Sequence, residues 1–142
     1  MTVSHILVPL DGSSESQNAL TFAAYFAEKF EARITLLHVI DLNAKMSDLD
    51  RVTMSGYIPG DILEEGYKLL ADAARKIPQD IQIETAVLPG HPANVILEQA
   101  EKNKSDLIIL GTRGLGAVKG LLLGSVSAAV IQKSTCPVLT TK

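Results

Sequence analysis

The stretch DLIILGTRGLGAVKGLLLGSVS, residues 106–127, joins a short apolar run to a glycine-rich segment and then to the start of a helical pattern. Five of the ten glycines of the chain lie between Gly111 and Gly124. Glycine is used where φ must be positive or where another group must approach the main chain. Residues 106–110 predict a buried strand, and residues 125–133 predict a helix. A glycine-rich loop that leads into a helix N-terminus is a common anion-binding arrangement, so a ligand is expected here.

The rest of the chain shows the same alternation of apolar runs and helical patterns. The five runs that predict strands are 3–10, 33–40, 81–88, 106–110 and 137–141. Apolar side chains at helical spacing predict helices at 13–30, 61–77, 92–102 and 125–133. Residues 41–59 have the weakest pattern and are predicted to form a loop. Strands that alternate with helices are typical of a parallel sheet with helices on both faces. We therefore expect a single α/β domain, 1–142, on an open five-stranded parallel sheet.

Composition and charge exclude several classes of function. The net charge of the 142-residue chain is −3 and its basic residues do not cluster, which argues against a surface for nucleic acid. The single cysteine, Cys136, excludes an internal disulfide and a cysteine-built metal site, and it fits a reducing cytoplasm. No apolar run approaches about 18 residues, so no membrane span is expected. The N-terminal segment lacks the basic region of a signal peptide and is interpreted as a strand.

The sequence also indicates where a ligand would bind. In open parallel sheets, ligands bind beyond the carboxyl ends of the strands, where the strand order reverses. The first strand ends at Pro9-Leu10-Asp11, and the fourth ends directly before Gly111. If these two strands are neighbours, Asp11 and the glycine loop face one crevice, and the helix that starts at Ser125 points its N–H groups into it. Phosphate is therefore the first ligand to consider.

Two common phosphate-binding motifs are absent from the chain. No glycine is followed by Lys and then Ser or Thr, as a P-loop requires. The glycines at 114, 116 and 120 are spaced one residue too widely for a dinucleotide fingerprint, and they follow the fourth strand instead of the first.

A different spacing is present. Gly111-x-x-Gly114, nine further residues and then Gly124-Ser125 form the pattern G-2x-G-9x-G-[ST]. This pattern resembles the ATP-binding branch of the universal stress protein family. The resemblance covers nearly the whole chain, since ILVPLDGS (6–13) is similar to the family's first strand and turn. Residues 90–114 and 120–139 are similar to its later helices and strands.

The resemblance implies a nucleotide-binding α-hydrolase-like fold with strand order 3-2-1-4-5, and ATP as ligand with a Mg or Mn ion. Asp11 would lie near the ribose and help to hold the metal ion through the phosphates. Pro9 and Leu10 would line the nucleoside pocket, and Val39 would offer main-chain groups to the adenine. The remaining residues would form the phosphate cradle: Gly111, Arg113, Gly114, Gly124, Ser125, Val126 and Ser127. The resemblance also implies a homodimer formed through the last strand, 137–141.

Several of these residues also have structural explanations. Gly111 and Gly114 are compatible with a sharp exit from the strand, and Arg113 with a solvated side chain. Asp11 is suited to cap the first helix, as are Ser13 and Ser14, the latter in a capping box with Gln17. Ser125 is expected to be the N-cap of the last helix. His38 is interpreted as a core or sheet-end histidine, and Cys136 as a small buried residue.

The sequence favours binding over catalysis. Phosphoryl transfer needs a positioned nucleophile, metal-binding carboxylates and cationic stabilisation. The chain offers one suitable carboxylate, Asp11, and one cation, Arg113, with no evident base and no Ser-His-Asp set. We expect an ATP-binding regulatory protein of a stress response, without efficient catalysis. The alternatives are a slow ATPase or phosphotransferase, and a ligand-free dimeric interaction module.

Overall fold

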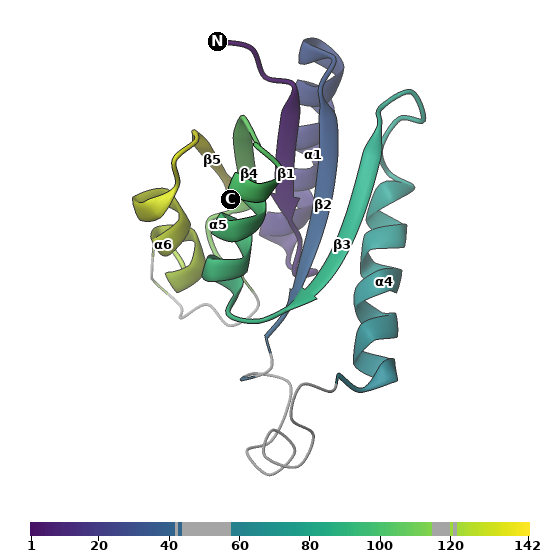
Figure 1. Ribbon diagram of the computed structural model, residues 1–142, viewed down its shortest axis with the longest axis vertical. Helices are drawn as coiled ribbons and strands as arrows, with labels where there is room; N and C mark the ends of the chain where they lie inside the picture. Colours follow the sequence, from purple (N-terminus) through teal and green to yellow (C-terminus); the bar gives the residue numbers. More distant parts are fainter. Residues whose placement is uncertain (42, 44–57, 115–119, 121) are drawn as a thin grey trace.

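The computed structural model describes residues 1–41, 43, 58–114, 120 and 122–142. Most of the predicted loop 41–59, together with Gly116 and Lys119, lies outside these residues. Five strands form one sheet in the order β3-β2-β1-β4-β5, and every neighbouring pair is parallel (Figure 1). The strands are β1 (His5–Pro9), β2 (Arg33–Ile40), β3 (Ile83–Pro89), β4 (Leu107–Gly111) and β5 (Val138–Thr141). The helices are α1 (Ser14–Phe30), α4 (Gly60–Ala74), α5 (Pro92–Lys102) and α6 (Ser125–Lys133). The expected fold class and strand order are confirmed.

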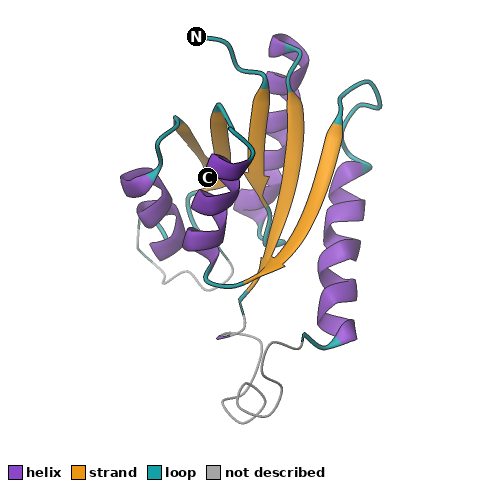
Figure 2. Cartoon of the chain, viewed as in Figure 1, coloured by secondary structure: helices purple, strands orange, loops and turns teal. Residues whose placement is uncertain are grey.

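Helices cover both faces of the sheet (Figure 2). Alternate residues of a strand point to opposite faces, so each strand contributes to two cores. Leu36 packs in the core beneath α1 and α4, whereas its neighbour Leu37 packs in the core beneath α5 and α6. Both are fully buried. Burial on two faces explains why β1, β2 and β4 are nearly continuous apolar runs rather than alternating patterns.

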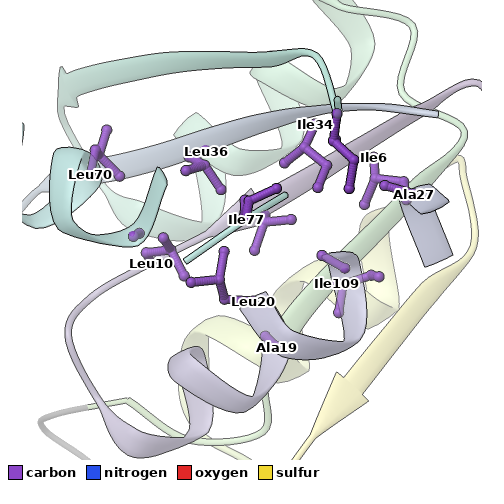
Figure 3. Close-up of a cluster of buried hydrophobic side chains, with 14 of the residues drawn as sticks. Ile6, Leu10, Ala19, Leu20, Ala27, Ile34, Leu36, Leu70, Ile77 and Ile109 are labelled. Atoms are coloured by element: carbon purple, nitrogen blue, oxygen red, sulfur yellow. The ribbon is translucent and has the colours of Figure 1, made fainter. Parts of the chain in front are cut away.

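The larger core lies between the sheet and helices α1 and α4 (Figure 3). Helix α1 contributes mostly small side chains to it, among them Ala19, Ala23 and Ala27. Small side chains let the helix lie close to the sheet, and Gly111 of β4 faces it. A Cβ on residue 111 would lie only 2.7 Å from the Cβ of Glu15. The absence of a side chain at Gly111 is therefore required by packing, whatever binds nearby.

The structure selects one of the two caps expected for the first helix and corrects two details at the helix starts. Ser13, not Ser14, is the N-cap of α1, because the Ser13 side chain accepts a hydrogen bond from the Ser16 N–H. The Ser14–Gln17 capping box is therefore wrong. Gly124, not Ser125, is the N-cap of α6, since its carbonyl accepts the first helical hydrogen bond, from Ala128.

The second helix also ends earlier than expected, at Ala74 instead of Ile77. The N–H groups of Lys76 and Ile77 bond to carbonyls three residues back, which is a tighter turn than the α-helix. The cause lies in Pro78, because the residue before a proline is disfavoured in the α conformation.

Strands β1 and β4 are neighbours, with Ile6 paired to Leu107 and Leu7 to Ile108. The carboxyl ends of these two strands therefore meet at one end of the sheet, as the strand order implied by the family resemblance requires. The chain crosses from β1 to β2 on one side of this pair and from β4 to β5 on the other side. The strand order therefore reverses between β1 and β4. In the part of the chain that the structure describes, no helix has the length and apolar character needed to cross a membrane.

Candidate functional site

The turn after β1 places Asp11 at the edge of the sheet. Leu10 is buried, and its N–H donates to the Leu37 carbonyl at 2.8 Å, one step beyond the last ladder pair of β1 and β2. Asp11 Oδ1 accepts a hydrogen bond of 2.9 Å from the N–H of Ser13. Gly12 has a φ of 87°, a conformation that favours glycine. The carboxylate thus stabilises the turn, but it does not cap α1, whose N-cap is Ser13.

The two ends of the glycine segment meet at Thr112, which is buried at the end of β4. The Thr112 carbonyl accepts hydrogen bonds from the Gly124 N–H at 2.7 Å and from Ser127 Oγ at 2.6 Å. The Thr112 N–H donates to the Thr141 carbonyl at 2.7 Å. These bonds hold the start of α6 against the ends of β4 and β5. The buried Ser127 hydroxyl therefore has a structural role that the sequence reading, which placed it in the cradle, does not include.

Gly114 lies against Asp11. A Cβ on residue 114 would be 2.5 Å from Asp11 Oδ2, closer than real Cβ atoms approach an oxygen. The glycine motif and the end of β1 are therefore brought together, as predicted from the strand order. The side chain missing from Gly114 makes room for the second oxygen of the Asp11 carboxylate.

The N-terminus of α6 carries the groups suited to an anion. The first N–H groups of a helix have no partner within the helix, and they form its positive end. The cap residue Gly124 has no side chain to accept from them. Ser125 is exposed and Val126 half-buried, with the Val126 side chain packed on the second core. The N-terminus of α6 therefore offers main-chain N–H groups, rather than side chains, as hydrogen-bond donors to an anion.

Arg113 has a partner that the sequence did not indicate. Its guanidinium Nη2 lies 3.6 Å from Oε1 of Glu15, in the first turn of α1. Ser14 Oγ donates to the other oxygen of the same carboxylate, Oε2, at 3.0 Å. Arg113 is thus half-buried in an ion pair, not a freely solvated side chain. The pair joins elements about one hundred residues apart in sequence, so no local pattern could reveal it.

A family model describes nearly the whole chain. The model of the universal stress protein family matches residues 2–142. The chain belongs to the universal stress protein family. It is 35% identical to universal stress protein YxiE of Bacillus subtilis over 94% of this chain and 95% of that protein.

Two solved structures of universal stress proteins resemble the chain in fold. Protein UspA from Lactobacillus plantarum has a TM-score of 0.81 and 26% identity over 100% of this chain and 99% of that one. A universal stress protein in complex with cAMP has a TM-score of 0.73 and 26% identity over 100% of this chain and 98% of that one.

The remaining candidates surround this edge of the sheet. Pro9 closes β1, and Val39 lies near the end of the adjacent strand β2, half-buried on the face of α5 and α6. Over the described ranges, no three His, Cys, Asp or Glu side chains are grouped so that they could hold a metal ion. One carboxylate at Asp11 fits a metal ion whose other ligands are phosphate oxygens and water, as Mg²⁺ prefers in phosphate sites.

Proposed function

We propose that the chain binds ATP with a Mg or Mn ion at the carboxyl ends of β1 and β4, and that it acts as a nucleotide-dependent regulatory protein without efficient catalysis. The observation that carries the proposal is the approach of Gly114 to Asp11 beside the glycine-capped N-terminus of α6. This arrangement presents main-chain N–H groups for phosphate and a carboxylate for a metal ion or a ribose hydroxyl. One solved universal stress protein, 26% identical to this chain, is a complex with cAMP, which supports an adenine nucleotide as the ligand.

The proposed pose assigns each part of the nucleotide to a part of the fold. Phosphates lie at Gly111–Gly114 and at Gly124–Ser127, where a helix start stabilises negative charge. The nucleoside lies against Pro9 and Leu10, with the adenine edge near the main chain of Val39. Arg113 touches a phosphate only after it leaves Glu15, so binding exchanges one charged partner for another.

The same geometry favours binding over turnover. Catalysis of phosphoryl transfer needs a group that positions the attacking nucleophile and cations that stabilise the transition state. Arg113 is held by Glu15, and the hydroxyl of Ser127 is bonded to the Thr112 carbonyl. Neither group is poised as a catalyst in this arrangement.

We further propose that two chains associate through β5, the last strand of the sheet. An edge strand presents main-chain N–H and C=O groups that can pair with another chain. Residues 137–141 include the β-branched Val138, Thr140 and Thr141, which favour strand pairing. Light scattering of the purified protein with and without Mg-ATP measures the molar mass. A dimer is expected, and a monomer in both conditions contradicts this part of the proposal.

The proposed function is tested by identifying what the protein carries and what it releases. The protein is purified without added nucleotide and denatured, and small molecules in the supernatant are identified by chromatography and mass. ATP in near-stoichiometric amount, with no phosphate released over hours in Mg-ATP, is the expected result. ADP alone, or phosphate release that scales with protein concentration and is lost in Asp11→Asn, favours the slow ATPase. If the protein carries no nucleotide and does not bind added Mg-ATP, the ligand-free dimeric interaction module is favoured.

A further inference from the structure

His38 is a buried histidine near the carboxyl end of β2, with 8% of its surface exposed. Its Nδ1 lies 2.8 Å from the carbonyl oxygen of Leu10. A carbonyl only accepts hydrogen bonds, so Nδ1 carries the proton and donates. The sequence indicated a core or sheet-end histidine, and the structure adds that the ring binds the turn after β1.

Both the N–H and the carbonyl of Leu10 form hydrogen bonds with residues of β2. Its N–H donates to the Leu37 carbonyl at 2.8 Å, and its own carbonyl accepts from His38. The peptide group that follows joins Leu10 to Asp11. Because a peptide group is planar, fixing the Leu10 carbonyl also fixes the direction of the Asp11 N–H. Leu10 is 2% exposed, so its carbonyl needs a protein partner.

Helix α4 holds the imidazole from the other side. A Cβ on Gly66 would lie 3.0 Å from Cδ2 of His38 and 2.9 Å from Cγ1 of Val87. The ring thus lies between the turn and a helix that approaches through a glycine. This packing restricts the motion of the ring, which favours the rotamer that donates to the Leu10 carbonyl.

We infer that His38 is a positioning residue for the nucleotide site: its Nδ1–H fixes the Leu10–Asp11 peptide, and thereby sets the Asp11 carboxylate against Gly114. This inference rests on the proposed function, because Asp11 and Gly114 belong to the proposed ATP site. His38 acts through the main chain and does not touch the nucleotide.

Two nearly isosteric substitutions separate the hydrogen bond from the shape of the side chain. His38→Asn keeps an N–H donor at the same number of bonds from the backbone as Nδ1, whereas His38→Leu has a similar size and no donor. Mg-ATP affinity is measured by calorimetry, and stability by denaturant unfolding. We expect His38→Leu to bind about fivefold to tenfold more weakly, the size of one lost positioning hydrogen bond, and His38→Asn to stay within about threefold of the wild type. His38→Gln, whose donor lies one bond further out, replaces His38→Leu if that variant does not fold.

The matched control is His5, a second buried histidine, 2% exposed, at the opposite end of the sheet. Its Nε2 lies 2.7 Å from Thr35 Oγ1, and its Nδ1 lies 3.2 Å from the Asn103 carbonyl. His5→Leu also removes hydrogen bonds from a buried imidazole, so it reports the effect of lost stability alone. We expect His5→Leu to unfold at lower denaturant concentration and to bind Mg-ATP as the wild type does.

The outcomes distinguish the two proposals. Weak binding in His38→Leu with recovery in His38→Asn and no change in His5→Leu supports the positioning role. The positioning role is overturned if His38→Leu binds Mg-ATP as tightly as the wild type. It is also overturned if His38→Leu and His5→Leu lose affinity equally. Either result leaves the proposed function standing. No Mg-ATP binding by the wild type overturns the proposed function, and the inference fails with it.

Discussion

The substitution Gly114→Ala adds one methyl group at the point where the glycine motif meets the end of β1. The φ of Gly114 lies outside the left-handed region, so the backbone accepts alanine and the effect is steric. The new Cβ would lie 2.5 Å from Asp11 Oδ2, so the carboxylate must move. Movement weakens the 2.9 Å hydrogen bond from the Ser13 N–H to Oδ1 and displaces Oδ2, the oxygen that lies against Gly114.

The expected cost to binding follows from the lost contact. A hydrogen bond to a charged group contributes about 1.5–3 kcal/mol, so Mg-ATP affinity should fall by about tenfold to hundredfold. The assay is calorimetric titration of Mg-ATP into the wild type and the variant, with denaturant unfolding to show that both fold. Gly60→Ala is the matched control, because a Cβ at Gly60 meets nothing within 4 Å. Wild-type affinity in Gly114→Ala refutes the reasoning, as does an equal loss in Gly60→Ala.

Three further predictions concern stability and charge. Gly111→Ala places a Cβ within 2.7 Å of the Glu15 Cβ on α1 and should lower the free energy of unfolding of the ligand-free protein by about 1–3 kcal/mol. An unchanged urea midpoint would show that the close packing of Gly111 against α1 is not needed for stability. Glu15→Gln releases Arg113 from its ion pair and should strengthen Mg-ATP binding by up to about fivefold. Weaker binding in a titration would contradict the proposal that Arg113 exchanges Glu15 for a phosphate. Burial and then the nearby Arg33 charge lower the pKa of His5 below 6.5, so its stability contribution is complete above pH 6.5 and is lost as pH falls through the folded pKa. His5→Leu should therefore flatten the pH dependence of the unfolding midpoint just below pH 6.5, and an unchanged slope would show that His5 is not its source.

Much of the fold could be predicted because the local patterns agree with one another. Residues 33–40 form a strand with the bounds that their apolar run indicates, because most side chains of a strand buried on both faces are apolar. The neighbouring position of β1 and β4, on which the site depends, follows from the family resemblance and not from a local pattern. The turn between β1 and α1 could also be predicted, because Asp11 and Gly12 are residue types that favour turns.

The details that failed depend on tertiary contacts. Ser125 has the residue type of an N-cap, but it is the first residue of α6, and Gly124, whose N–H donates to the Thr112 carbonyl, is the N-cap. The partners of Arg113 and His38 come from distant parts of the chain, and no spacing rule connects them.

Binding of Mg-ATP at the carboxyl ends of β1 and β4 can be followed at the backbone amides in solution during a titration. Nuclear magnetic resonance spectra report each amide separately, so one experiment measures both affinity and location. We expect saturating shifts concentrated at Asp11, Gly114 and the first residues of α6, with little change at His5 at the other end of β1. Absence of saturating shifts at millimolar Mg-ATP, or shifts centred away from the ends of β1 and β4, would contradict this proposal.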